Sequence, residues 1–139
     1  MLVNWFISIG IKQQQHIHKV MVIFRFENLE IWQLSIKIAD KLFDIADDLE
    51  QRKLFRFAEQ IRGAGMSVSN NIAEGSGSRS KKVFINYLEY ARRSTFENAN
   101  ILILMNRRKL VSEEIKEEIK EELDELCRKI TNFQKSLSR

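Results

Sequence analysis

The stretch GSGSRSKK at residues 75–82 holds the residue types best suited to binding a phosphate group. A catalytic phosphate loop needs the pattern G-x-x-x-x-G-K-[ST] between a strand and a helix. Gly75 and Gly77 are only two residues apart, and the segment before them has helical spacing. We therefore predict a turn between two helices here, with cations beside it, and no nucleotide-hydrolysing site.

Side chains that carry out covalent chemistry are scarce. His16 and His18 lie near the N-terminus, outside the patterned part of the chain, and Cys127 lies between apolar positions of the last helical segment. The chain has no Glu-x-x-His motif at inward positions, which di-iron bundles need. Paired acids recur every four residues, which is typical of a solvated helix face; they are Glu113/Glu114, Glu117/Glu118 and Glu121/Glu122. We expect a protein that is no enzyme and has neither a cofactor nor a metal.

The composition favours long helices with few connections. The 139 residues include no proline and five glycines, and 44% of them are hydrophobic. A β-rich domain draws heavily on proline and glycine for its turns. A single cysteine excludes an intramolecular disulfide, which is compatible with a cytoplasmic location. The length is that of one domain.

Apolar residues with 3.6-residue spacing predict four helices: from Leu29 to about Leu49, from about Leu54 to Glu74, from Lys81 to Arg108, and from the N-cap Ser112 onward. We expect Phe57 and Ile115 among the inward positions. Helices of similar length with short links predict an all-α, up-down-up-down antiparallel four-helix bundle.

The first helix carries two adjoining apolar stripes, and this leaves two interpretations. One stripe steps through Trp32, Ile36 and Phe43, and the other through Leu34, Ile38 and Ile45. Either the helix is buried between two neighbours of its own bundle, or one stripe meets another subunit.

Glycines mark two positions in the second helix. Gly63 and Gly65 lie inside the periodic segment, where each destabilises a helix by about 1 kcal/mol relative to alanine. We therefore expect another backbone to approach closely there. Gly75 is predicted to cap the end of this helix, and Ser78 or Ser80 to cap the next one.

Residues 1–24 differ from the rest and are interpreted as an N-terminal extension, with the bundle domain at 25–139. The extension has no acidic residue, and its apolar run Leu2–Ile11 is too short to cross a bilayer. Lysines follow this run instead of preceding it, which argues against a signal peptide. Two origins stay open: translation starting at Met21, or a short apolar arm that docks on a partner. We expect no membrane association.

Charge is unevenly distributed along the chain. Residues 25–50 carry seven acids against three bases, whereas residues 76–109 carry eight bases against two acids. Either the basic helix complements acidic neighbours within the bundle, or it binds nucleic-acid phosphates. The candidate nucleic-acid-binding residues are Arg79, Lys81, Lys82, Arg92, Arg93, Arg107, Arg108 and Lys109. We rank Arg92 and Arg93 highest, because they lie in mid-helix, where the helix dipole has no effect.

The segments FRFENLEIWQLSIKIAD, IRGAGMSVSNNIAEGSGSRSKKVFINYLEYARRSTFENANIL and LCRKITNFQKSL resemble one family, the proteins encoded within intervening sequences of bacterial 23S ribosomal RNA genes. The most specific element is S-N-N-I-A-E-G, which comprises Ser69, Asn70, Asn71, Ile72, Ala73, Glu74 and Gly75. The resemblance covers about Phe24 to Leu137.

This resemblance implies a helical bundle that forms a homo-oligomeric ring, typically a pentamer. A related family, the accessory proteins of diversity-generating retroelements, implies binding to nucleic acid and to a reverse transcriptase. The expected function is thus weak, sequence-independent RNA binding by an oligomer. The alternative is an adaptor that binds a partner protein in grooves between subunits.

Overall fold

The computed structural model describes residues 20–139, and all of its regular elements are helical. A 3₁₀ turn, η1 (Arg25–Asn28), precedes four long helices. These are α2 (Glu30–Gln51), α3 (Phe55–Ser76), α4 (Lys81–Arg107) and α5 (Glu113–Leu137). The described residues form no strand, and the predicted helix ranges are confirmed to within a few residues at each end.

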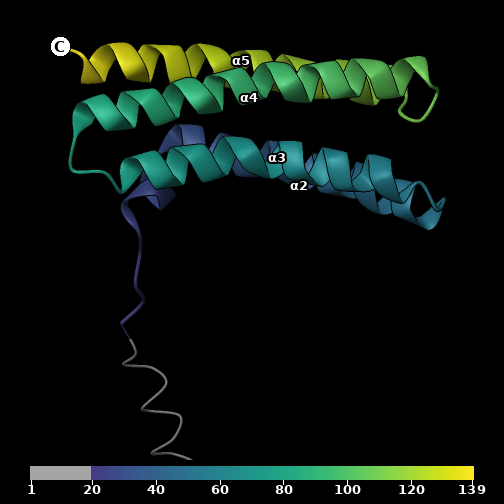
Figure 1. The fold of residues 1–139 in the computed structure, drawn as a ribbon, viewed down its shortest axis with the longest axis horizontal. Coiled ribbons are helices and arrows are strands. Elements are labelled where there is room, and N and C mark those ends of the chain that lie inside the picture. Colours follow the sequence, from purple (N-terminus) through teal and green to yellow (C-terminus); the bar gives the residue numbers. More distant parts are fainter. Residues whose placement is uncertain (1–19) are drawn as a thin grey trace, which may run out of the picture.

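Successive helices run antiparallel and pack as a four-helix bundle (Figure 1). Helix α3 lies between α2 and α4, and α5 contacts α4 and, over a smaller area, α2. Helices α2 and α4 have no contact with each other, so they occupy diagonal corners of the bundle. The predicted fold class is therefore confirmed for the single chain.

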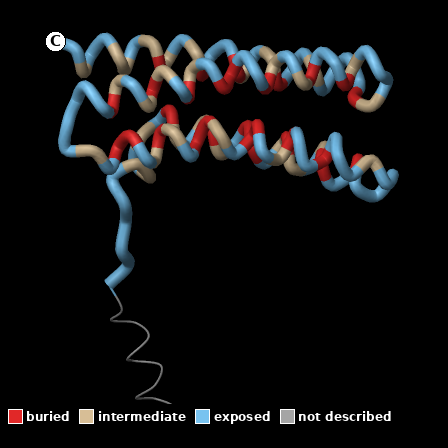
Figure 2. The backbone as a smooth tube through the Cα atoms, in the orientation of Figure 1, coloured by how far each residue is buried: buried red, intermediate tan, exposed pale blue. Residues whose placement is uncertain are grey.

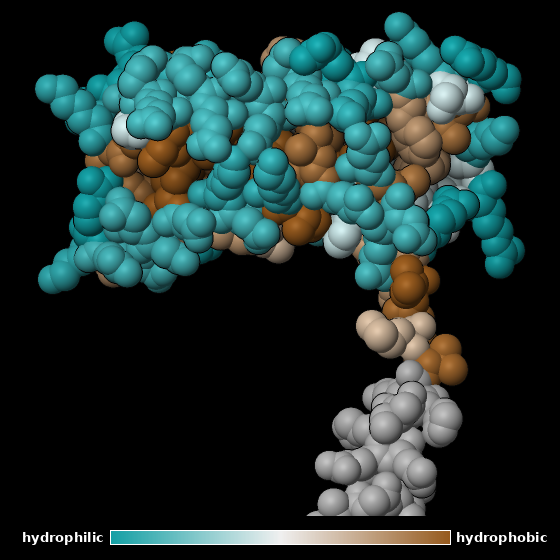
Figure 3. Space-filling view, turned by 180° about the vertical axis from the view of Figure 1, so that it is seen from behind, coloured by the Kyte–Doolittle hydropathy of each residue, from teal (hydrophilic) through white to brown (hydrophobic). Residues whose placement is uncertain are grey.

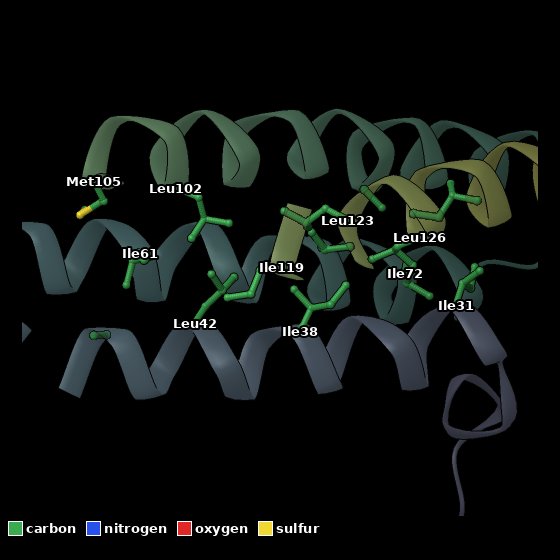
Figure 4. Packing of buried hydrophobic residues seen from close by; sticks show 14 of the residues in the cluster. Ile31, Ile38, Leu42, Ile61, Ile72, Leu102, Met105, Ile119, Leu123 and Leu126 are labelled. Atoms are coloured by element: carbon green, nitrogen blue, oxygen red, sulfur yellow. The ribbon is translucent and has the colours of Figure 1, made fainter. Parts of the chain in front are cut away.

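The core lies along the axis of the bundle, where the buried positions of the four helices face one another (Figures 2 and 4). Leu42, Ile61, Leu102, Ile119 and Leu126 are all at most 2% exposed. Each fully buried side chain of this size contributes about 1.5–3 kcal/mol through the hydrophobic effect.

The bundle itself uses both apolar stripes of α2. On one side, Phe43 lies beside Gly65 of α3, and on the other, Ile45 lines a hollow with Leu110 and Ile119. Lys41 donates to Glu118 at 2.9 Å and also to Glu122, which ties α2 to α5. The interpretation of α2 as a helix between two neighbours accounts for both stripes.

Helices α2 and α4 end in the same turn, at the repeated tripeptide Arg-Lys-Leu. Lys53 and Lys109 both have a left-handed backbone, with φ of 62° and 59°. The Leu54 N–H donates to the Leu49 carbonyl, and the Leu110 N–H donates to the Met105 carbonyl, each at 2.9 Å. These bonds define Schellman motifs, in which glycine usually takes the left-handed position.

The predicted cap at Gly75 is wrong. Gly75 lies inside α3 and is buried, and a Cβ atom there would clash with the side chains of Phe84 and Tyr87 on α4. Helix α3 instead ends at Gly77, whose φ of −74° is right-handed. Gly75 therefore permits the close approach of α4.

The predicted close approach at Gly63 and Gly65 holds for one glycine. A Cβ atom at Gly65 would lie 3.2 Å from Leu42 Cδ1, whereas a Cβ atom at Gly63 would meet nothing within 4 Å.

Two inward predictions are also wrong, because Phe57 and Ile115 are 37% and 42% exposed. Both lie in the first turn of their helix, and on α3 the core position of that turn is taken by the next residue, Ala58, which is fully buried.

A buried amide links α3 to α4. Asn98 is 1% exposed, and its Nδ2 donates to the carbonyls of Ala64 on α3, at 2.8 Å, and Ser94, at 2.7 Å. A buried polar group needs such partners, so this contact favours one register of the two helices.

The described chain begins as an exposed apolar segment. Val20, Met21, Val22, Ile23 and Phe24 are between 62% and 85% exposed and extend from the bundle (Figure 3). Residues 1–19, and with them most of the predicted extension, lie outside the described residues. Among residues 20–139, no helix has the length and apolar content needed to cross a membrane.

Candidate nucleic-acid interface

Helix α4 begins at a well-defined N-cap with three exposed cations around it. The Ser80 Oγ accepts from the Val83 N–H at 3.3 Å, and the Ser78 Oγ accepts from the Ser80 N–H at 3.1 Å. The predicted cap is therefore confirmed at Ser80. The cations Arg79, Lys81 and Lys82 are all exposed, at a helix end that favours anions.

The α4 cations have no ion pair with another helix among the described residues. Ion pairs between helices join α2 to α5, as in Lys41–Glu118, and α2 to α3, as in Arg62–Asp47. The acidic α2 lies diagonally from α4 and has no contact with it. One interpretation of the sequence is that the basic helix complements acidic neighbours within the bundle. As far as ion pairs between helices are concerned, that interpretation is wrong.

Nine cations of residues 20–139 form ion pairs, and eight of them lie outside residues 76–109. The nine are Lys37, Lys41, Arg52, Arg62, Arg92, Lys116, Lys120, Arg128 and Lys129. Seven of the eight predicted site residues therefore have no acidic partner in the described part of the chain. We call these seven the free cations: Arg79, Lys81, Lys82, Arg93, Arg107, Arg108 and Lys109.

Arg92 is the exception, because it is held by Glu89 on its own helix. Its Nε donates to the carboxylate at 2.9 Å and its Nη2 donates at 2.6 Å, and the guanidinium lies over the Phe96 ring. The Gln134 Nε2 of α5 donates to the same carboxylate at 3.3 Å. The two-point bond from Arg92 lowers the pKa of Glu89 and raises that of Arg92. The charge of Arg92 is largely neutralised within the bundle.

Arg93, the next residue, is exposed and forms no ion pair within residues 20–139. One residue along a helix turns a side chain by about 100°, so Arg92 borders α5 while Arg93 faces outward. Of the two residues ranked highest from the sequence, Arg93 is therefore the one whose charge is available to bind a phosphate group.

The remaining free cations lie at the other end of α4. Arg107 is in the last turn, Arg108 is the C-cap, and Lys109 takes the left-handed position of the Schellman motif. A 27-residue helix is about 40 Å long, which separates the two clusters by roughly the length of 12 base pairs. A nucleic acid in contact with both clusters must run along the full helix.

The S-N-N-I-A-E-G element forms the last turns of α3 and has a structural role in the bundle. Ile72 is fully buried, and Glu74 accepts a hydrogen bond from the Tyr87 hydroxyl at 3.2 Å. The Asn71 Nδ2 donates to the Ser67 carbonyl of the same helix, at 2.8 Å, while Asn70 is exposed. Glu74 and Gly75 therefore hold α3 against α4, and Ile72 adds to the core.

One cation beside this site was not singled out from the sequence. The Arg25 guanidinium of η1 donates to the Ser76 carbonyl and lies 5.8 Å from the centre of the Phe84 ring. Its proximity to α4 depends on a contact across 51 residues, which no local pattern reveals.

No group of three His, Cys, Asp or Glu side chains within residues 20–139 is arranged to hold a metal ion. His16 and His18 lie outside the described residues. Cys127 is a half-buried free thiol on α5.

Comparison with protein families gives a match over residues 27–132, to the 23S rRNA-intervening sequence proteins. The chain belongs to this family. The match includes all of α2, α3 and α4 and most of α5, so it covers the whole candidate interface. The description of the family names no enzymatic activity.

The bundle is also similar to a solved structure from Bacteroides thetaiotaomicron, a protein of unknown function from the S23 ribosomal protein family. The TM-score is 0.71 at 25% sequence identity, over 76% of this chain and 98% of that one. None of the curated proteins matches the chain.

Proposed function

We propose that this member of the 23S rRNA-intervening sequence proteins is a non-enzymatic, cytoplasmic RNA-binding protein. In this proposal the free cations of α4 and its flanking turns bind phosphate groups without reading the bases. The supporting observation is that, within residues 20–139, seven cations on α4 and in its flanking turns have no acidic partner, while most other cations of the bundle are paired. Cations without partners attract the phosphate backbone and release its counterions on binding.

The experiment is RNA binding by the full chain, measured by fluorescence anisotropy between about 50 and 200 mM salt. We expect log Kobs to fall by about 0.7 per phosphate contact for each tenfold rise in salt on a single strand. Replacement of Lys81, Lys82 and Arg93 by glutamine should weaken binding and flatten this slope. The matched control replaces the paired Lys116, Lys120 and Lys129 by glutamine and should keep the slope. A slope equal in both variants would refute the assignment of the interface.

We also propose that copies of the chain associate into a ring, which is typically pentameric in the family. Exposed apolar side chains support association, because monomeric proteins seldom expose large apolar patches. Phe96 of α4 is 62% exposed, Phe55 of α3 is 55% exposed, and the segment Val20–Phe24 adds five more apolar side chains. Light scattering at micromolar concentration tests the ring, and the mass of a monomer would exclude it.

A second candidate function, binding of a partner protein, is supported by an open seam between α2 and α5. There a hollow of about 330 Å³ has apolar walls of Ile45, Val111 and Ile115, and acids at its rim (Figure 3). Such a groove fits an amphipathic helix with basic flanks. Recovery of a partner from nuclease-treated lysate, lost with Ile45→Asp, would favour this function over RNA binding.

A further inference from the structure

A second feature of the candidate interface is a hollow of about 360 Å³ where α2 and α4 begin and α5 ends. Three cations line it: Arg25 from η1, Arg79 from the turn before α4, and Lys81 from the first turn of α4. Its apolar wall is formed by Leu29, Phe84, Phe133 and Leu137. We call this hollow the cationic pocket.

The lining of the cationic pocket distinguishes it from the other hollows described. Each of the four others includes at least one aspartate or glutamate, such as Asp44, Asp124, Glu30 and Glu59, whereas the cationic pocket includes none. Its positive charge is therefore not offset by the residues that line it. Among anions, one with two negative charges gains the most binding free energy at such a site.

Arg25 is held in place by neutral groups. Its guanidinium donates to the Ser76 carbonyl and lies over the Phe84 ring, so it is positioned while its charge stays uncompensated. Arg79 and Lys81 have no ion pair within residues 20–139 either. The three cations come from segments up to 56 residues apart and are brought together by the fold.

The size and the apolar wall restrict the ligand. Sites for small molecules start at about 300 Å³, so a hollow of this volume accommodates about one nucleotide. A terminal phosphate monoester carries a charge of about −1.5 to −2 at pH 7, more than a diester within a strand. The apolar wall beside the cations suits the face of a base or a ribose, while the phosphate takes the cations.

We propose that the cationic pocket binds a nucleotide through its phosphate monoester, with the terminal nucleotide of an RNA strand as the source. This inference rests on the proposed RNA binding and adds recognition of a strand end to it. Phosphates within the strand contact the rest of α4, and the end determines where the strand begins on the helix.

The test compares RNA oligonucleotides of one sequence with a 5′-phosphate, a 3′-phosphate or hydroxyl groups at both ends, by anisotropy with the full chain. We expect one of the phosphorylated ends to bind roughly five- to tenfold more tightly than the hydroxyl ends. Arg79→Gln with Lys81→Gln should abolish this preference. The matched control, Arg107→Gln with Arg108→Gln, removes the same charge from the far end of α4 and should weaken all three RNAs while keeping the preference.

Equal affinity for all three oligonucleotides would overturn end recognition while leaving RNA binding intact. Titration with adenosine 5′-monophosphate, followed by NMR, distinguishes a free nucleotide from a strand end. A further outcome separates the two proposals: the chain binds the mononucleotide but no RNA, and Arg79→Gln with Lys81→Gln removes the nucleotide binding. That outcome would support the nucleotide site in the cationic pocket and refute the proposed RNA-binding function. Competition by inorganic phosphate as strong as that by the mononucleotide would refute the role of the apolar wall.

Discussion

Residue 75 of α3 lies so close to Tyr87 of α4 that a Cβ atom at this glycine would be 2.5 Å from the Tyr87 Cβ. The Phe84 ring would be 2.9 Å away. The last glycine of the S-N-N-I-A-E-G element is therefore required by the crossing of two helices.

Gly75→Ala is expected to lower the free energy of unfolding by about 1–3 kcal/mol, because the added methyl group overpacks the crossing. The matched control is Gly63→Ala on the same helix, where a Cβ atom meets nothing within 4 Å. This control should raise stability by about 0.5–1 kcal/mol through better helix propensity. Urea denaturation measures both changes. A neutral Gly75→Ala would contradict the close approach.

Lys53→Gly and Lys109→Gly should each raise the free energy of unfolding, by about 0.5–1 kcal/mol. Both residues have a positive φ, a conformation that costs an L-amino acid about 1–2 kcal/mol and costs glycine little. Lys→Ala at the same positions removes the same charge without relieving the backbone, and should leave stability the same or lower. Thermal unfolding of the four variants separates the effect of the backbone from that of the charge.

Arg92 and Arg93 should give opposite results in two assays. Arg92→Ala breaks the bond to Glu89 and the contact with Phe96, so we expect a loss of stability of roughly 0.5–1 kcal/mol and little change in RNA affinity. Arg93→Ala should leave stability within about 0.5 kcal/mol and weaken RNA binding. The prediction fails if the variant that loses RNA binding is Arg92→Ala.

The Glu89–Arg92 pair should make stability depend on pH on the acid side. The pKa of Glu89 is lowered in the folded chain by the bond from Arg92, while in the unfolded chain it is about 4.3. The stabilisation is therefore complete above about pH 4.3 and is lost as the pH falls through the lower, folded pKa. Glu89→Gln should be less stable than the parent at pH 7 and lose that difference at acid pH. Denaturation curves between pH 3 and 7 measure it, and a difference that is constant with pH would contradict this assignment.

The sequence predicted the helices well, because periodic apolar positions such as Ile61, Val68 and Ile72 depend on local geometry alone. The turns were harder to predict. The left-handed residues are lysines, while the glycine that looked like a cap lies inside a helix. Glycine suits both a left-handed turn and a close helix crossing, and only the neighbouring helix shows which role applies.

The candidate site was predicted in part, for a similar reason. The basic segment was evident from charge counting, but the pairing of individual cations depends on which helices are neighbours. Because α2 lies diagonally from α4, its acids leave Arg93 without a partner, and Glu89 on the same helix takes up Arg92. Arg25 reaches the site by tertiary contact alone.

The two Arg-Lys-Leu turns lie at one end of the bundle, and the segment Val20–Phe24, the C-terminus and the turn before α4 lie at the other (Figure 1). An affinity tag or a fused protein at the C-terminus therefore lies beside the cationic pocket, which Leu137 lines, and there it competes with the ligands to be measured. Fluorophores and surface linkages are better placed at Lys53, about one helix length away. Assays with cleaved, untagged chains are the appropriate reference for every binding measurement described above.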